Sequence, residues 1–290
     1  MTPLRQRMLD AMVLRGLAVR TQQAYIAAVA GLARHYGRAP DTLTAEQVQA
    51  YLLHLVRQRG LATSSVNQCS SGCRFFYGTV LGLDGAAFQI PLARAPQRLP
   101  EVLSRQEIAR LLAAARHPKS RTVFMLAYGS GLRLSELCQL RVEHIDSAPD
   151  RRCIRVVQGK GGKDRYVPLA SDVLEGLRAW WRFAHCRGWL FGAAHDAGQA
   201  LDIKSVQRWY RAACAHAGIT KQGGIHTLRH CYATHLLEAG VDLYSLSQWL
   251  GHKHVSTTLR YLHLARPDAP DGARRDPLAL LSALPRMPAH

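Results

Sequence analysis

Apolar residues recur every three or four positions along the first part of the chain, which is the spacing of one face of an amphipathic helix. Two threonines stand where helices are expected to begin: Thr44, with Gln47 three positions later as in a capping box, and Thr63. The pattern predicts four short helices: residues 4–14, residues 21–36, a stretch from Thr44, and residues 63–77. Helices of this length make a small bundle, so we expect residues 1–87 to form a first domain.

The apolar periodicity is lost over residues 88–102. This segment contains three prolines together with Arg94 and Arg98. Prolines without periodicity are typical of an extended linker, because proline fixes the backbone and cannot donate a backbone hydrogen bond. On composition alone, an ordinary surface loop explains the segment equally well.

Helical periodicity returns after a second capping box, Ser104–Glu107. It predicts four further stretches: a helix that ends before Pro118, an apolar helix over 121–128, a short helix over 135–140, and mainly helical structure after Ser171. Two alternating segments, 153–157 and 165–169, flank a glycine-rich run. They predict a β-hairpin, because strands show every second residue to the same side.

The predicted fold class is therefore mainly α. A four-helix first domain is followed by a second domain, residues 103–266, which is mixed α/β, mostly helical, and holds a small antiparallel sheet. Residues 267–290 begin with prolines and charges and then become apolar from Pro277 to Leu284. An apolar terminal helix needs a surface to cover, either on its own domain or on a neighbouring protomer.

The net charge of the chain says more about its binding partner than the overall composition does. The chain has 38 Lys and Arg against 20 Asp and Glu, a net charge of +18. Such an excess, spread along the whole sequence, favours a polyanionic partner, since Lys and Arg displace counterions from phosphates. Arg94 and Arg98 on the linker are candidate contacts to nucleic acid.

Other sequence signals exclude several classes of protein. The longest apolar runs are too short for a membrane span, and the charged N-terminus does not resemble a signal peptide, so we expect a cytoplasmic protein. Seven scattered cysteines without a second pair at metal-ligand spacing indicate reduced thiols and no zinc site.

Four segments could carry chemistry. They are Arg133 with Glu136, Lys160 with Lys163 on the hairpin turn, His226 with Arg229, and His252 with Tyr261. Each has an ordinary alternative: an exposed ion pair, a solvated turn, a polar helix face opposite a stripe of buried leucines, and a packed aromatic ring. Gly251 is expected to end one helix and Ser256 to cap the next, so that Tyr261 lies about a turn and a half into it.

Taken in order, these segments resemble the tyrosine recombinase (phage integrase) family, and in detail its Xer-type and mobile-element members. The resemblance spans residues 103–264, the whole catalytic domain, and more loosely the first, SAM-like core-binding domain. It implies that Arg133 and Arg229 grip the scissile phosphate, that Lys160 (with Lys163 as a less good substitute) is the hairpin lysine, and that His226 and His252 are the two histidine positions. Glu136 would be the supporting acidic residue and Tyr261 the nucleophile.

The resemblance also implies a function. It predicts a site-specific recombinase that cuts and rejoins double-stranded DNA through a 3′-phosphotyrosine, without a metal or other cofactor. We expect a monomer in solution that assembles as a tetramer on paired DNA sites, with a tail that docks in trans, and a role in integration, excision or transposition of a mobile element. Xer-type dimer resolution is the alternative, ahead of a type IB topoisomerase-like enzyme or a regulator that does not cut DNA.

Overall fold

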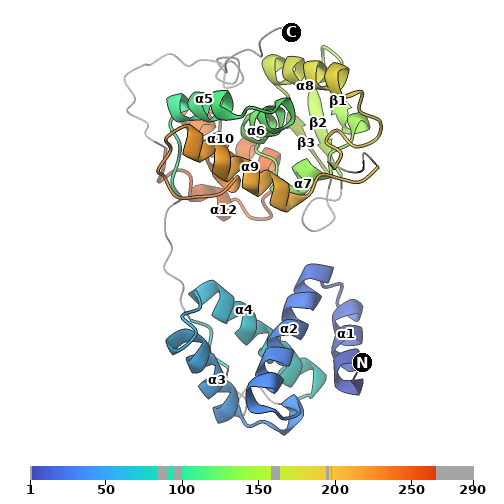
Figure 1. Ribbon diagram of the computed structural model, residues 1–290, viewed down its shortest axis with the longest axis vertical. Coiled ribbons are helices and arrows are strands. Elements are labelled where there is room, and N and C mark those ends of the chain that lie inside the picture. The colour runs from blue at the N-terminus through green and yellow to red at the C-terminus, as the bar shows by residue number, and fades with distance from the viewer. Residues whose placement is uncertain are drawn as a thin grey trace. The chain divides into compact units, whose positions relative to one another are not determined.

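The computed structural model describes residues 2–83, 90–93, 100–157, 164–193, 196 and 198–265 (Figure 1). It divides into two compact units, Met1–Arg98 and Leu99–His290. Arg94, Arg98, Lys160, Lys163 and the tail after residue 265 lie outside the described residues. In the part of the chain that the structure describes, no helix is long and apolar enough to cross a membrane.

The first unit is helical, as predicted. Its elements are α1 (Pro3–Leu14), α2 (Val19–Tyr36), the 3-10 turn η1 (Pro40–Thr42), α3 (Ala45–Arg57), α4 (Thr63–Arg74) and the π-helical turns η2 (Phe75–Val80). Thr44 and Gln47 form the predicted capping box of α3. The core of the unit contains Met12, Leu32, Val48 and Phe76, all fully or nearly fully buried.

A glycine allows the closest helix packing of this unit. A Cβ atom on Gly72 of α4 would lie 3.0 Å from the Ala28 Cβ and 3.1 Å from the Tyr25 Cα of α2. The bare backbone of Gly72 therefore lets the two helices approach closely.

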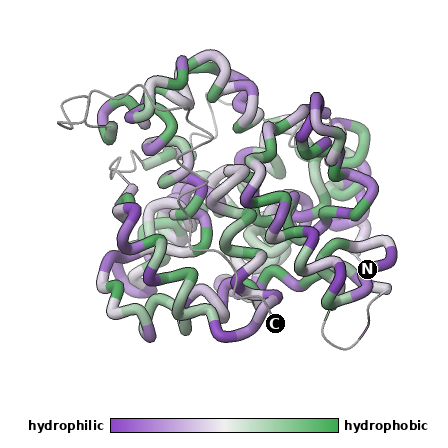
Figure 2. The backbone as a smooth tube through the Cα atoms, turned by 90° about the horizontal axis from the view of Figure 1, so that it is seen from above, coloured by the Kyte–Doolittle hydropathy of each residue, from purple (hydrophilic) through white to green (hydrophobic). Residues whose placement is uncertain are grey.

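The second unit packs helices around a small sheet. Its elements are α5 (Arg105–Ala114), α6 (Pro118–Ser130), α7 (Leu134–Cys138), the 3-10 turn η3 (Val142–His144), β1 (Ile145–Asp146), β2 (Cys153–Val156), β3 (Arg165–Pro168), α8 (Ser171–Ala184), α9 (Ile203–His216), α10 (His226–Glu238), α11 (Leu243–Leu250) and α12 (Ser256–Leu259). Ser104 and Glu107 form the predicted capping box of α5. Hydrophobic and hydrophilic residues are interspersed along the described chain (Figure 2).

The predicted antiparallel pairing of the two strands is confirmed, and the sheet gains a third strand. The sheet has the order β1-β2-β3 and is antiparallel throughout, with Ile154 opposite Val167. Both of these residues are fully buried, which fixes the register, because a shift by one residue would turn them toward solvent. β1 has two residues, too few for its alternation to be visible in the sequence.

Two helices, α6 and α10, pack against each other and are buried around most of their circumference. This corrects the prediction for α10, in which His226 and Arg229 were expected on a face apart from the buried stripe. Arg229 is only 3% exposed. A buried guanidinium is tolerated where carbonyl groups accept its hydrogen bonds, and the C-terminal ends of α6 and α11 supply such acceptors to Arg229.

Gly131 makes the junction between α6 and α7 possible. It ends α6 with φ +59°, and a Cβ atom there would lie 2.4 Å from Cδ1 of Tyr232 on α10. We expect Gly131→Ala to lower the free energy of unfolding by about 2–4 kcal/mol, because the left-handed backbone is strained for alanine and the new methyl group collides with a buried ring.

Denaturant unfolding of the full chain measures this effect. The matched control is Gly218→Ala, since Gly218 has φ +63° and nothing within 4 Å of its Cβ position. That control carries the backbone strain alone, so its expected loss is only about 1 kcal/mol. Equal losses in the two variants would show that contact with Tyr232 does not constrain Gly131.

Candidate active site

Four pieces of backbone bring the candidate residues of the second unit together. Arg133 is the N-cap of α7, directly after the turn at Gly131. His226 and Arg229 belong to the first turn of α10, and His252 follows the left-handed Gly251 that ends α11. Tyr261 follows α12 and is 3% exposed. Positions separated by more than a hundred residues thus meet in one cluster.

Arg229 forms hydrogen bonds with several parts of this cluster. Its Nη1 donates to the carbonyl oxygen of Gly131 at 2.6 Å, and its Nη2 donates to that of Leu250 at 2.7 Å. These carbonyls lie at the C-terminal ends of α6 and α11, where the helix dipole favours a cation. Burial lowers the pKa of Arg229 to about 10, and the positive charge of Arg133 adds to this effect, so Arg229 stays protonated at neutral pH.

Arg133 lies beside it. Its Nη2 donates to the carbonyl oxygen of Gly251 at 2.8 Å, and its Nη1 donates to Glu136 Oε1 at 2.8 Å. Both arginines therefore contact the end of α11, one through Leu250 and the other through Gly251. Two fixed guanidinium groups at one place make a strong anion site, because each can present parallel N–H donors.

Arg165 was missed by the sequence analysis. From β3 it donates to both oxygens of Glu136, at 2.9 and 2.7 Å, and its Nε donates to the carbonyl oxygen of Trp249 at 2.8 Å. Its side chain is 10% exposed and that of Glu136 is 9% exposed. Glu136 thus bridges Arg133 and Arg165. The only sequence signal was an arginine directly after the glycine-rich turn, and nothing linked it to a carboxylate 29 residues earlier.

This bridge gives a prediction about acid stability. Burial alone would raise the pKa of Glu136, but hydrogen bonds and charge from Arg165, then from Arg133, lower it from 4.5 to about 2. A lowered carboxyl pKa stabilises the fold by about 3 kcal/mol above pH 4.5. This contribution is lost as the pH falls from 4.5 toward 2.

Glu136→Gln should remove that contribution at neutral pH and lower the free energy of unfolding by about 3 kcal/mol or more, since two partly buried arginines lose their counter-charge. Unfolding measured between pH 7 and pH 3 checks both points. The variant should lose less stability than the wild type over this range, and parallel pH curves would contradict the role of Glu136.

His252 is held by two hydrogen bonds. Its Nδ1 pairs with Thr258 Oγ1 at 2.7 Å, and Arg229 Nη2 donates to its Nε2 at 3.2 Å. Its ring stacks on that of Tyr261, with an interplanar angle of 12° and ring centroids 6.3 Å apart. Burial, then the charges of Arg229 and Arg133, lower the pKa of His252 to about 3, so the ring is neutral at neutral pH.

Tyr261 contacts a histidine that the sequence analysis did not identify. Its hydroxyl lies 3.0 Å from Nδ1 of His230, one turn after His226 on α10. Burial raises the pKa of Tyr261, and the charges of Arg229 and Arg260 oppose that rise. The phenol is therefore protonated at rest, next to a cation that favours its ionised form.

The local structure around Tyr261 differs from the expectation. Ser256 does not cap α12: the N-cap position is Val255, and no side chain hydrogen-bonds the helix start. The helix ends at Leu259, so Tyr261 lies in the turns beyond it rather than inside it. Thr258 belongs to this short helix but directs its hydroxyl to His252, which links the tyrosine turn to the end of α11.

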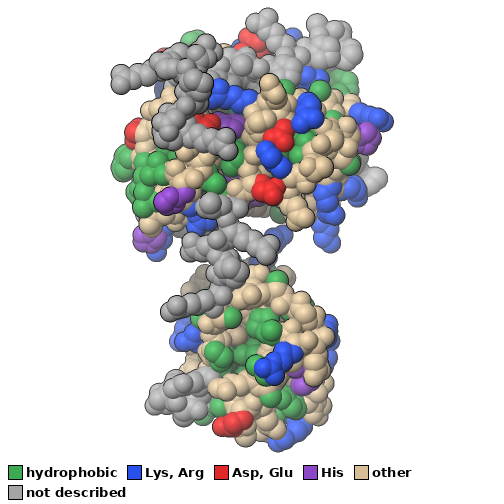
Figure 3. All heavy atoms as spheres, turned by 90° about the vertical axis from the view of Figure 1, so that its left-hand side faces the viewer, with side chains coloured by type: hydrophobic (Ala, Val, Ile, Leu, Met, Phe, Trp, Pro, Cys, Tyr) green, Lys and Arg blue, Asp and Glu red, His purple; other side chains and the backbone are tan. Residues whose placement is uncertain are grey.

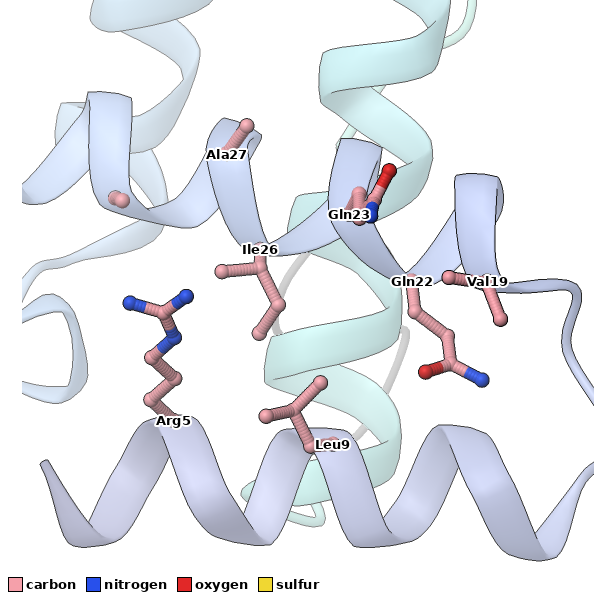
Figure 4. Close-up of a pocket in the computed structure, with 8 residues that line it drawn as sticks. Arg5, Leu9, Val19, Gln22, Gln23, Ile26 and Ala27 are labelled. Atoms are coloured by element: carbon pink, nitrogen blue, oxygen red, sulfur yellow. The ribbon is translucent and has the colours of Figure 1, made fainter. Parts of the chain in front are cut away.

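In the described part of the first unit, the grooves contain no comparable chemistry. One of them lies between α1 and α2, where Arg5 and Leu9 face Gln22 and Ile26 (Figure 4). Its remaining walls are apolar side chains and Gln23. Among the described residues of both units, no group of three His, Cys, Asp or Glu side chains could hold a metal ion. The described part of the candidate site consists of arginines, histidines, Glu136 and Tyr261.

Comparison with known proteins agrees with this geometry. Residues 101–267 match the phage integrase family, and residues 4–85 match the N-terminal SAM-like domain of phage integrases. The Sinorhizobium fredii protein y4qK, whose name places it among integrases and recombinases, is 39% identical over 270 residues, which cover 91% of this chain and 85% of that protein.

Two further relatives extend the comparison. The tyrosine recombinase XerC of Xanthomonas campestris is 36% identical over 217 residues, which cover 71% of this chain and 66% of XerC. A lambda integrase tetramer bound to a Holliday junction shares the fold, with a TM-score of 0.71, 19% identity, and coverage of 89% of this chain and 76% of that one. Family match, sequence identity and fold agree, so the chain belongs to the phage integrase family and is a tyrosine recombinase.

Proposed function

We propose that this recombinase cuts and rejoins double-stranded DNA through a 3′-phosphotyrosine on Tyr261. The observation that carries the proposal is the convergence of Arg133, Arg229 and His252 with the buried Tyr261 hydroxyl in one cluster. Such a cluster offers a nucleophile and, beside it, two permanent cations for the phosphate under attack.

The proposed roles follow from the charge that develops during the reaction. In-line attack by the phenol oxygen places extra negative charge on the non-bridging phosphate oxygens. Arg133 and Arg229 hold those oxygens, because guanidinium groups pair with phosphate in a bidentate manner and stay charged. His226, exposed at the start of α10, and His252 complete the phosphate site. Glu136 and Arg165 keep Arg133 in place.

The leaving group needs a proton. We assign this role to Lys160 on the hairpin turn, with Lys163 as the less favoured alternative. The bond between phosphorus and the 5′-oxygen breaks as the tyrosine–phosphorus bond forms, and the lysine protonates the 5′-oxygen. A 5′-hydroxyl from another strand then attacks the phosphotyrosine, releases Tyr261 and reseals the DNA.

DNA contact extends beyond the active site in this proposal. Lys and Arg side chains are spread over the visible face of both units (Figure 3), in agreement with the net charge of +18. The first domain, residues 1–87, would bind the duplex together with the catalytic domain, residues 103–266. Arg94 and Arg98 on the linker would contact phosphates. Binding should therefore weaken steeply with salt.

The assembly is proposed by analogy with the lambda integrase tetramer on a Holliday junction. Monomers in solution would form a tetramer on paired sites in the cytoplasm, with residues 267–290 docked on a neighbouring protomer. We favour a role in integration, excision or transposition of a mobile element, in line with the relative named as an integrase or recombinase. The similarity to XerC supports dimer resolution as the second candidate.

A suicide substrate tests the chemistry. Binding sites are first selected from a randomised duplex library with the full chain. A nick placed next to the cleavage position then lets the short cleaved fragment diffuse away, which traps the covalent complex. The expected result is a protein–DNA adduct with a free 5′-hydroxyl end, and peptide mapping should locate the DNA on Tyr261. An adduct through a 5′-phosphate or on another residue would overturn the proposal.

A further inference from the structure

One side chain is hydrogen-bonded to the Tyr261 hydroxyl and has no role in the reaction described so far. His230 Nδ1 lies 3.0 Å from the phenol oxygen. The His230 ring is oriented by its neighbours: it meets the ring of His226 edge to face at 5.1 Å and lies 5.7 Å from the ring of Tyr261. A ring fixed in this way keeps one nitrogen directed at the phenol.

The other histidines of the cluster are engaged differently. Both ring nitrogens of His252 are occupied, one by Thr258 and the other by the Arg229 guanidinium, and its ring contacts Tyr261 by its face. His226 contacts His230 rather than the phenol. Among the histidines that the structure describes, the hydrogen bond of the phenol oxygen goes to His230.

Resting on the proposed function, we propose that His230 is a further catalytic residue, whose Nδ1 accepts the phenolic proton of Tyr261 during attack on the DNA. The O–H bond breaks toward His230, the oxygen–phosphorus bond forms, and the bond to the 5′-oxygen breaks as Lys160 protonates that oxygen. When the strand is resealed, His230 returns its proton to the departing phenolate.

The protonation states fit this role. Burial, then the charges of His226, Arg229 and Arg260, lower the pKa of His230 to about 4, so its ring is neutral and able to accept a proton at neutral pH. A bound phosphate would offset the charge of the arginines. The basicity of His230 would then rise when DNA is present, which couples activation of the nucleophile to the substrate.

His230→Asn separates proton transfer from positioning. The amide oxygen of asparagine takes nearly the place of Nδ1 and accepts the same hydrogen bond, but it does not take up a proton. We expect single-turnover adduct formation on the suicide substrate to slow about 10²- to 10⁴-fold, with unchanged DNA affinity. The matched control is His216→Asn, an exposed histidine on α9, which should react at the wild-type rate.

Two further measurements identify the missing step. A fluorinated tyrosine at position 261 has a more acidic phenol, so it should recover part of the rate of the His230→Asn variant. A sulfur leaving group at the 5′ position needs no proton, so it should rescue Lys160→Ala but not His230→Asn. Wild-type activity should also fall at acidic pH as His230 becomes protonated. The titratable and charged groups around His230 are His226, Arg229, His252 and Arg260. This fall in activity should be absent from the His230→Asn variant.

The outcomes are distinct. Wild-type rates in His230→Asn, or full rescue of that variant by the sulfur leaving group, overturn the role of His230 and leave the proposed function intact. Absence of any adduct with the wild-type protein contradicts the proposed function itself. A slow variant rescued by the fluorinated tyrosine supports proton acceptance by His230.

Discussion

Tyr261→Phe should abolish covalent capture of the suicide substrate. We expect the rate of adduct formation to fall by a factor of about 10⁴ or more, as is usual when a nucleophile is removed. The phenylalanine ring keeps the stacking on His252, while the hydrogen bond between the phenol and His230 is lost. Stability should therefore fall by no more than about 1–2 kcal/mol, and DNA binding should persist.

The measurement is a time course of adduct formation under single-turnover conditions. Tyr244→Phe is the matched control, because Tyr244 lies on α11 and is 66% exposed. It should react like the wild type. An adduct that persists in Tyr261→Phe would show that another residue attacks the DNA.

Arg229→Lys should have the second largest effect, although it conserves the charge. One ammonium group cannot replace a planar guanidinium that bonds Gly131, Leu250 and His252 at the same time. A helix-end carbonyl would lose its donor, at a cost of about 1–3 kcal/mol. With the loss of bidentate phosphate contact, we expect cleavage to slow about 10²- to 10³-fold.

Adduct formation and denaturant unfolding should be measured on the same preparation. Arg178→Lys on the exposed side of α8 is the control, and it should leave both quantities unchanged. If Arg229→Lys were destabilised but cleaved DNA at the wild-type rate, Arg229 would be a structural residue and not a phosphate ligand.

Local sequence signals predicted much of the fold. The capping boxes at Thr44 and Ser104 start α3 and α5 where expected, because an N-cap hydroxyl and a side chain three residues later satisfy the free amides of one turn. The hairpin was visible for a similar reason, since alternation over β2 and β3 depends on neighbouring residues only. Both signals are complete within a few residues of chain.

Predictions that required distant partners were wrong or missing. From its helical position relative to the apolar stripe, Arg229 was expected on a face apart from the core, but acceptors from α6 and α11 make its burial favourable. Tyr261 was expected inside a regular helix. In the structure the helix ends at Leu259, and Thr258 bonds His252 from the preceding turn.

The sequence by itself determined the fold class, the family and the identity of Arg133, His226, Arg229, His252 and Tyr261 as candidates, because their order and local spacing are read along one chain. Only the tertiary structure decided what these side chains contact. Arg165 reaches Glu136 across 29 residues, and His230 reaches Tyr261 across 31. Such pairs form when separate elements pack around a common core, and no periodicity within either segment records the contact.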